Sequence, residues 1–391
     1  MKKIIIGVPT LNSGGVEVSL VRLLDELSKN KEVKITLLLL KKEGLYLDSI
    51  SKDIEVKTVT YTDDIYSYDK RISDIKNIKG IKNKILFFSY RYKLRKLLKE
   101  NDWENYYKLI LSKVNKINGR YDLAIDWHGY GHFMTTVIAD IVSAKKKAMW
   151  IHDEKNEWLD KVNCWLEKYS NFFCVSKSCM DSLIAHYPQL RLKIDTCYNL
   201  INYEEIRNKA NERIEYKLCD DVCSIITVGR LEWQKGYDIA IKIAEILKER
   251  NFKFCWYVIG TGSLKDELDS LIISKNLTNE FKLLGLKPNP FPYIKKGDLY
   301  LQPSRHEGYG LAIAEARVLG TIPIATNLSC IKEQIVDGKN GYVCELDPED
   351  FALKIIKVYS DKKLLKKLKS NLACESFDYS DELNKIYNLL K

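Results

Sequence analysis

Two cations lie beside the start of a predicted helix in the C-terminal half of the sequence. Arg230 follows Gly229 at the end of a predicted strand, and Lys235 comes five residues later, directly before Gly236 at the helix start. The first N–H groups of a helix have no partner within it, so they attract anions, and each cationic side chain adds a charge-assisted hydrogen bond worth about 1.5–3 kcal/mol. The spacing predicts a diphosphate site, although cations that only cap a surface turn would have the same spacing.

A glycine-rich turn with two carboxylates follows further along the chain. Segment 303–311 reads PSRHEGYGL and leads into a predicted helix, so its glycines leave free N–H groups around Gly310 and Leu311 that suit a phosphate. Glu307 precedes this helix and Glu315 lies more than one turn inside it. Because carboxylates accept hydrogen bonds from sugar hydroxyls, we expect one of them to contact a transferred sugar and the other a ribose.

The N-terminal half carries weaker candidates of its own. Gly14 and Gly15 lie between a predicted strand and a predicted helix, where glycines permit close approach of the backbone to a ligand. His152 directly follows one predicted strand, and His128 follows another. A single histidine at such a position is more often structural than functional, so these rings alone assign no chemistry.

These residues lie between elements of an alternating strand and helix pattern. Apolar, β-branched runs at 3–8 and 33–40 predict buried strands, and a helical period at 16–28 separates them. Further strands are predicted in two series, at 123–127, 147–151 and 172–175, and then at 225–228, 254–259, 281–284, 299–302 and 322–325. Helices are predicted in the second series at 236–249, at 263–275 and from about residue 311, whereas segment 62–120 follows no clear pattern.

The polar region 202–221 separates the two series and is the expected linker between two halves of the chain. Ligands of doubly wound sheets bind beyond the carboxyl ends of the strands. We therefore expect an α/β protein with two Rossmann-like domains facing a central cleft, which would be the active site.

Composition excludes several classes of protein. Hydrophobic residues make up 46% and charged residues 30% of the 391 residues, which is typical of a folded chain of about two domains rather than of a disordered or fibrous one. No apolar run reaches the roughly 20 residues that span a bilayer, and the apolar start of the chain has no cleavage site, so we expect a cytoplasmic location. The ten cysteines contain no C-x-x-C pair, which gives no sign of a metal site or a disulfide framework. The run GTG at 260–262 lacks the third glycine of the dinucleotide fingerprint, which argues against NAD.

The positive charge of the chain is concentrated in segment 70–99. From Lys70 to Lys99 there are eleven Lys or Arg residues and one acid, Asp74, so the segment carries +10, equal to the net charge of the whole chain. Apolar and aromatic residues, among them Phe88 and Tyr92, interleave with the cations, and this pattern favours an anionic membrane surface. The alternative is a solvated helix whose apolar stripe belongs to the core. Nucleic acid is not expected, because no recognition motif accompanies the charge.

As a set, these motifs resemble those of the retaining glycosyltransferases of family 4, also called glycosyl transferases group 1, and in particular bacterial surface-polysaccharide glycosyltransferases. The resemblance is strongest over 224–345 and weaker over the N-terminal half. It is carried by G-R-x4-K-G at 229–236, E-G-Y-G at 307–310, G-G-V-E at 14–17 and W-I-H-D at 150–153.

The resemblance implies a GT-B fold. It places an acceptor-binding Rossmann-like domain at 1–202, a nucleotide-sugar-binding one at 203–372, and a C-terminal helix at 373–391 that packs toward the first domain. The co-substrate would be a nucleotide sugar, which we expect to be a UDP-sugar, and neither a cofactor nor a metal would be required.

The resemblance also implies roles for site residues. In the C-terminal domain it assigns the donor diphosphate to Arg230 and Lys235, the sugar to Glu307, the ribose hydroxyls to Glu315, and further phosphate contacts to the amides of Gly310 and Leu311. In the N-terminal domain, Gly14 and Gly15 would close on the donor phosphates, and His152 matches a histidine near the reacting sugar and acceptor. His306 departs from the family pattern, which leaves the choice of sugar open.

The implied mechanism needs no carboxylate nucleophile. As the bond to the diphosphate breaks, negative charge grows on the leaving group, and fixed cations and amides stabilise that charge where a metal ion would otherwise do so. The catalytic set is then His152, Glu307, Arg230 and Lys235, with Glu307 orienting the sugar.

The expected acceptor is a polyprenyl-diphosphate-linked saccharide at the inner face of the cytoplasmic membrane, to which segment 70–99 would bind the protein peripherally. Three alternatives remain open. They are a soluble small-molecule acceptor, a nucleotide-sugar epimerase on the same architecture, and a catalytically inactive membrane-surface protein that only binds a nucleotide sugar.

Overall fold

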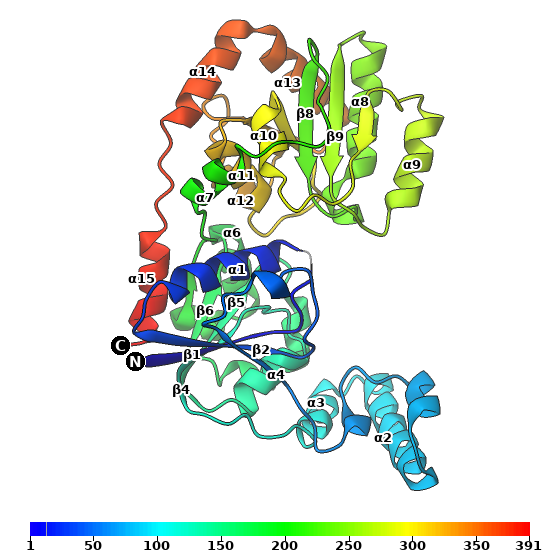
Figure 1. Cartoon of the computed structure of the whole chain (residues 1–391), viewed down its shortest axis with the longest axis vertical. Helices are drawn as coiled ribbons and strands as arrows, with labels where there is room; N and C mark the ends of the chain where they lie inside the picture. Colours follow the sequence, from blue (N-terminus) through cyan, green and yellow to red (C-terminus); the bar gives the residue numbers. More distant parts are fainter. Residues whose placement is uncertain (13) are drawn as a thin grey trace. The chain divides into compact units, whose positions relative to one another are not determined.

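The computed structural model describes residues 1–12 and 14–391, which divide into two compact units. Unit 1 consists of Met1–Val175, Cys179–Tyr198 and Glu382–Lys391, and unit 2 of Ser176–Ser178 and Asn199–Asp381. Both units are α/β and each is built on a parallel sheet, as expected from the sequence (Figure 1).

The sheet of unit 1 has the strand order β3-β2-β1-β4-β5-β6-β7. Its strands are β1 (Lys2–Val8), β2 (Val33–Leu39), β3 (Glu55–Thr58), β4 (Tyr121–Asp126), β5 (Ala144–Ile151), β6 (Asn171–Cys174) and β7 (Ile194–Thr196). Ile4, Ile5 and Ile6 of β1 are all fully buried, because both faces of a parallel sheet are covered. The chain order reverses at β1, which has β2 on one side and β4 on the other.

The helices of unit 1 are α1 (Gly15–Ser28), α2 (Ile81–Lys99), α3 (Trp103–Leu111), α4 (Phe133–Asp140), α5 (Asn163–Leu166), most of α6 (Lys177–His186) and most of α15 (Ser380–Leu389). In α1, Leu20, Leu23, Leu24 and Leu27 recur at helical spacing and are buried. In α15, Ile386 and Leu389 are buried, Lys385 Nζ donates to the Thr196 carbonyl at 2.8 Å, and Glu382 accepts from the Tyr198 N–H at 3.1 Å. This final helix therefore covers the end of the edge strand β7.

The segment that gave no clear pattern, 62–120, is an insertion between β3 and β4. It holds the 3₁₀ turns at Asp64–Tyr66 and Ile72–Asn77, followed by α2 and α3. In Figure 1, α3 lies between α2 and the sheet of unit 1. Helix α2 is exposed over most of its length and buries only four side chains, Phe87, Tyr90, Arg91 and Leu94.

Unit 2 has the strand order β10-β9-β8-β11-β12-β13. The strands are β8 (Cys223–Val228), β9 (Phe254–Ile259), β10 (Phe281–Leu283), β11 (Leu299–Gln302), β12 (Ile322–Thr326) and β13 (Tyr342–Cys344). The helices are α7 (Tyr203–Lys209), α8 (Tyr237–Glu249), α9 (Lys265–Ser274), α10 (Phe291–Lys296), α11 (Leu311–Val318), α12 (Ser329–Lys332), α13 (Pro348–Ser360) and α14 (Lys362–Ala373). Apolar clusters cover both faces of the sheet. The order reverses at β8, the first strand of this unit.

The polar region 202–221, expected to be a linker, lies within unit 2 instead. It contains α7, and its apolar residues Ile206 and Leu218 are buried in the same cluster as Ile226 of β8. These buried side chains tie the region to unit 2. The chain passes from unit 1 to unit 2 after Tyr198.

The loop after β4 lies tightly against the end of β5. Gly129 and Gly131 both have φ of +60°, in the left-handed region that favours glycine. A Cβ atom at Gly129 would lie 1.5 Å from the carbonyl oxygen of Trp150, two residues before His152. Only glycine permits this approach of the loop to the strand.

We expect Gly129→Ala to lower the free energy of unfolding by about 3 kcal/mol or more, because left-handed strain and a backbone clash add together. Gly320→Ala is the matched control, since Gly320 has a φ of +71° and no atom lies within 4 Å of its would-be Cβ. That variant should lose only about 1 kcal/mol in urea denaturation. Equal losses in the two variants would contradict the close approach at Gly129.

Candidate active site

The two loops that carry the C-terminal motifs follow adjacent strands. Strand β8 leads into loop 229–236 and β11 into loop 303–310, and these strands pair at the point where the strand order of unit 2 reverses. In doubly wound sheets this is the place where ligands bind. The Arg305 N–H donates to the Gln234 carbonyl at 2.8 Å, and Gln234 Nε2 donates to the His306 carbonyl at 2.9 Å. The two loops therefore form one hydrogen-bonded surface.

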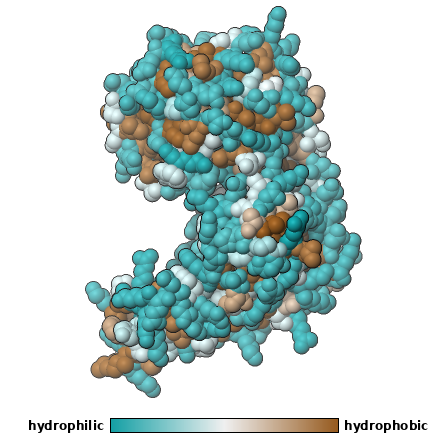
Figure 2. All heavy atoms as spheres, turned by 180° about the vertical axis from the view of Figure 1, so that it is seen from behind, coloured by the Kyte–Doolittle hydropathy of each residue, from teal (hydrophilic) through white to brown (hydrophobic). Residues whose placement is uncertain are grey.

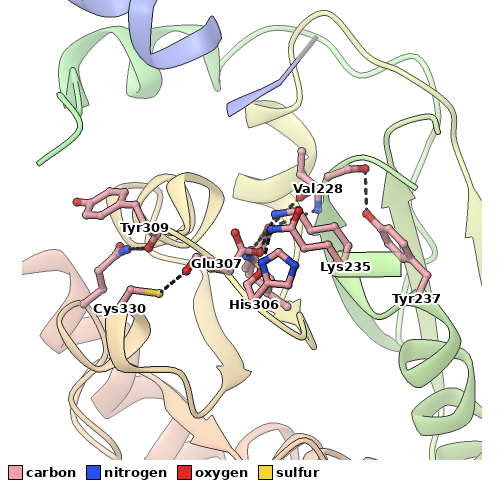
Figure 3. Close-up of polar contacts among 12 residues, drawn as sticks. Val228, Lys235, Tyr237, His306, Glu307, Tyr309 and Cys330 are labelled. Atoms are coloured by element: carbon pink, nitrogen blue, oxygen red, sulfur yellow. Dashed lines mark hydrogen bonds and ion pairs between the residues drawn. The ribbon is translucent and has the colours of Figure 1, made fainter. Parts of the chain in front are cut away.

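Lys235 and Glu307 form an ion pair at the centre of this surface (Figure 3). Lys235 Nζ lies 2.6 Å from Glu307 Oε1, and Gln302 Nε2 donates to the same oxygen at 2.6 Å. The hydroxyl of Tyr300 donates to Gln302 Oε1 at 2.9 Å and so fixes the orientation of that amide. Glu307 is only 7% exposed and the Lys235 side chain 20% exposed. The Glu307 carboxylate is thus held in one position by a cation and an oriented amide.

The start of α11 lies in the same loop system. Gly310 precedes the helix with φ of +86°, and its carbonyl accepts from the Ile313 N–H at 2.9 Å. The N–H groups of Leu311 and Ala312, at the helix start, have no partner within the helix. Gln334 Nε2 donates to the Tyr309 carbonyl at 2.5 Å, and the Cys330 thiol donates to the Glu307 carbonyl at 3.3 Å (Figure 3). These two contacts hold loop 303–310 in place over the helix start.

Arg230 and Glu315 complete the residues expected in this half. Arg230 is exposed directly after Gly229, whose carbonyl accepts a hydrogen bond from the Tyr237 hydroxyl at 2.9 Å. Glu315 is buried in the second turn of α11. The structure therefore brings Lys235 and Glu307 into direct contact, whereas it places Arg230 and Glu315 on the neighbouring elements.

Arg305 is a cation of the same motif that has a structural role. Its guanidinium forms a two-pronged contact with Asp238 at 2.8 and 2.6 Å, donates to the Trp233 carbonyl at 2.8 Å, and lies 4.5 Å from the centre of the Trp233 ring. These contacts lock loop 303–310 onto loop 229–236.

The sequence analysis missed Gln302 and Gln234. Gln302 is the one polar residue of the strand LYLQ and stands at its carboxyl end, which is a usable signal. Gln234 carries no such signal, because its role depends on a contact with a residue 72 positions away.

In unit 1, His152 lies at the equivalent edge of the sheet. It follows β5 directly, is buried, and its Nε2 lies 2.7 Å from the carbonyl oxygen of Trp127. Because a carbonyl only accepts, Nε2 carries the proton and Nδ1 is the acceptor of the neutral ring. Burial lowers the pKa of His152 to about 4, so the ring is neutral at pH 7.

The loop that holds His152 is itself anchored at both ends. Trp127 Nε1 donates to the Val16 carbonyl at 3.0 Å, which ties the loop to the first turn of α1, where Gly15 is the first residue and Gly14 the residue before it. Asp126, fully buried at the end of β4, accepts from the Thr135 hydroxyl at 2.5 Å and from the Gly129 N–H at 3.4 Å. Gly14, Gly15 and His152 therefore belong to one connected region of unit 1.

Further rings extend this region. His128 lies 4.8 Å from Tyr130 and 5.5 Å from His132 between ring centres, and the buried His128 Nδ1 has no hydrogen-bond partner in the described residues. Burial, together with the neighbouring His132 and His152, lowers the pKa of His128 to about 3. Burial also raises the pKa of Asp126 to about 6. Unit 1 thus offers neutral imidazole rings at its site, whereas unit 2 offers charged groups.

Comparison with known proteins gives the family of the C-terminal part. Residues 208–373 match the family described as Glycosyl transferases group 1. A Campylobacter jejuni protein, N-acetylgalactosamine-N,N'-diacetylbacillosaminyl-diphospho-undecaprenol 4-alpha-N-acetylgalactosaminyltransferase, is 26% identical over 384 residues, which cover 97% of this chain and 96% of that protein.

Two solved structures are similar over the whole chain. A TarM variant of Staphylococcus aureus, in complex with Fondaparinux, alpha-GlcNAc-glycerol and UDP, has a TM-score of 0.70 at 17% identity, with 100% of both chains covered. HepE of Anabaena, in complex with UDP-glucose, has a TM-score of 0.71 at 15% identity, with 100% of this chain and 99% of that chain covered. The fold is therefore GT-B, and residues 208–373 form a glycosyl transferases group 1 domain.

We expect Lys235→Met to lower the free energy of unfolding by about 2–3 kcal/mol, because it leaves the buried Glu307 carboxylate without its cation. Adding Glu307→Gln to that variant should restore most of the loss, since a neutral amide needs no cation. Urea denaturation measures both.

The matched control for this pair is Lys265→Met, because Lys265 also lies 2.6 Å from its partner Asp269 but both side chains are about half exposed. This control should change stability by less than about 1 kcal/mol. A Lys235→Met loss no larger than that of the control would refute the importance of the buried pair.

The histidine rings of unit 1 predict how stability depends on pH. The unfolded chain takes up a proton at each histidine below about pH 6.5, whereas folded His128 and His152 do so only near the lowered values given above, so acid favours unfolding by up to about 1.4 kcal/mol per pH unit for each ring. Asp126 acts in the opposite direction, because the folded form retains a proton up to a pKa of about 6. Burial also lowers the pKa of His132, which acts in the same direction as the other two rings. The free energy of unfolding should therefore fall as the pH drops from about 6 to 4, because the three rings together outweigh Asp126.

Removing one ring tests this prediction. His128→Asn should make the slope shallower by about one proton over that range, measured by urea denaturation at several pH values. An unaltered slope in His128→Asn would show that this ring is not held neutral by burial.

Proposed function

We propose that this chain is a retaining, metal-independent glycosyltransferase that moves a sugar from a nucleotide-diphosphate donor, a UDP-sugar, to a lipid-linked saccharide in bacterial surface polysaccharide synthesis. The observation that carries the proposal is the fixed pair of Lys235 and Glu307 beside the helix start at Gly310, within a glycosyl transferases group 1 domain. A cation, a carboxylate and free backbone N–H groups are the donors and acceptors that a sugar diphosphate requires.

On the donor side, Arg230, Lys235 and the amides of Gly310 and Leu311 bind the diphosphate, and Glu315 accepts from the ribose hydroxyls. The similar HepE and TarM structures contain UDP-glucose and UDP respectively, which supports a uridine nucleotide for this chain. During transfer, negative charge grows on the leaving diphosphate, and positive groups already in place lower the barrier without reorganisation.

Glu307 orients the sugar in this mechanism and does not attack it. One of its oxygens is already hydrogen-bonded to both Lys235 and Gln302, which fixes its position. Configuration is retained if the acceptor hydroxyl approaches on the side of the departing phosphate and gives its proton to a phosphate oxygen. That step uses no protein nucleophile.

We assign acceptor binding to unit 1, through His152, and we assign Gly14 and Gly15 of the same unit to the donor phosphates. The neutral His152 ring presents Nδ1 as an acceptor for a sugar hydroxyl. The C. jejuni relative is named for an acceptor on diphospho-undecaprenol, and its similarity spans both halves of this chain, which supports an acceptor of that class. Work on such an acceptor would place the enzyme at the inner face of the cytoplasmic membrane.

The purified protein, incubated with EDTA and a panel of nucleotide sugars, tests the proposal. We expect nucleoside diphosphate release from one uridine donor, increased by detergent-solubilised bacterial lipids and insensitive to EDTA. Lys235→Ala should slow release at least tenfold, equivalent to about 1.4 kcal/mol at the transition state, whereas Lys265→Ala should not.

Each other outcome contradicts a named part of the proposal. Loss of release in EDTA would contradict metal independence, and inversion at the anomeric carbon in the NMR spectrum of the product would contradict retention. Stimulation by soluble sugars but not by lipids would indicate a small-molecule acceptor. Donor binding by calorimetry without any release would indicate an inactive protein.

A further inference from the structure

Helix α2 has two apolar faces, and only one of them is used in packing. Phe87, Tyr90 and Leu94 recur at helical spacing and are buried. Phe87 packs with Ile65 and Ile78 of the same insertion, whereas Tyr90 and Leu94 join the main core of unit 1. This face therefore agrees with the alternative interpretation of segment 70–99, in which an apolar stripe belongs to the core.

The second face remains exposed. Ile81, Ile85, Phe88 and Tyr92 follow the spacing i, i+4, i+7, i+11 and are between 54% and 79% exposed. With Ile75, Lys84 and Ser89 they line an open hollow on the outside of unit 1. Figure 2 shows hydrophobic side chains at the outer end of this region, seen from behind. Four large apolar side chains in a row are unusual on a surface that contacts only water.

Cations border this exposed stripe on both sides. By helical spacing Lys84 and Arg95 lie along one side of it, and Lys82, Lys93 and Lys96 along the other. Lys96 pairs weakly with Glu100 at 3.9 Å, whereas Lys82, Lys84, Lys93 and Arg95 form no ion pair with any described residue. The charge of this face is therefore available to an external partner.

The arrangement selects one kind of partner. A second copy of the chain would bring two like-charged rims together in a symmetric contact, which is repulsive. An apolar centre with exposed aromatic side chains and a cationic rim instead fits the interface of an anionic bilayer, where apolar groups enter the headgroup region and cations contact phosphates. We propose that the exposed face of α2 docks on an anionic lipid surface, with Ile81, Ile85, Phe88 and Tyr92 inserted.

Because this proposal concerns binding alone, it does not rest on the proposed glycosyl transfer. The full chain, without donor or acceptor, is sedimented with vesicles of phosphatidylcholine alone or with phosphatidylglycerol added. We expect the protein to sediment with the anionic vesicles and to remain in the supernatant with the neutral ones. Added salt should weaken the binding, because it screens the cationic rim.

Two variants separate the apolar and the charged contributions. Ile85→Ser with Phe88→Ser and Tyr92→Ser, and separately Lys82→Gln with Lys84→Gln, Lys93→Gln and Arg95→Gln, should each lower the vesicle partition coefficient at least tenfold. All seven side chains are exposed, so thermal unfolding should be unchanged and should confirm that the variants fold.

Matched controls come from unit 2. Lys363, Lys366, Lys367 and Lys369 of α14 are exposed, and their change to Gln removes the same charge elsewhere. Ile273→Ser replaces an isoleucine that is 64% exposed, close to the 63% of Ile85. Both controls should bind vesicles as the natural chain does.

The remaining outcomes overturn the proposal. Equal binding to neutral and anionic vesicles, or no binding, would refute an anionic lipid partner. Wild-type binding by both α2 variants would place the membrane contact elsewhere. A concentration-dependent dimer in light scattering, lost in the triple serine variant, would identify a second copy as the occupant. Since these measurements need no transfer, failed docking and failed catalysis are distinguishable.

Discussion

In a parallel sheet, the loops that follow the strands all lie at the edge formed by the carboxyl ends of the strands. This constraint determines where a functional site can form in both units. In each sheet the chain order reverses at the first strand, and this reversal is where ligands of doubly wound sheets bind. Loops 229–236 and 303–310 follow the two strands that meet at this point in unit 2, and Trp127 follows β4, which pairs with β1 at this point in unit 1. His152 follows the next strand, β5. The apolar strands that are buried beneath them provide the rigid support.

The two sites obtain their polarity by different physical means. In unit 2, contacts of Lys235 and Gln302 with one oxygen of the buried Glu307 carboxylate offset the cost of burying its charge. In unit 1 burial shifts His128 and His152 toward the neutral form, and raises the pKa of Asp126 in the same sense. The first environment suits a charged ligand such as a diphosphate, whereas the second suits the uncharged hydroxyls of a saccharide.

The hydrophobic pattern of the sequence predicted the buried strands of both units. The sequence pattern is regular in the runs at 3–8 and 33–40 and in the strands after residue 225. In these strands the side chains are apolar because both faces of each sheet are covered. The secondary structure of segment 62–120 could not be predicted from its sequence. Helix α2 carries apolar residues on two opposite faces, so its hydrophobic residues do not follow the period of a helix with one buried face. The contact of Lys235 with Glu307 was also beyond the sequence, because it joins residues 72 positions apart and depends on the pairing of β8 with β11.

The docking of α15 on unit 1 has a consequence for biosynthesis. Unit 1 includes residues 382–391, which the ribosome adds only after the whole of 199–381 has been made. Because domains tend to fold in the order of their synthesis, unit 2 can acquire its core while unit 1 still lacks the helix that covers the end of its edge strand β7. The unit that emerges first is thus completed last, and the end of β7 stays uncovered until residues 382–391 have been made.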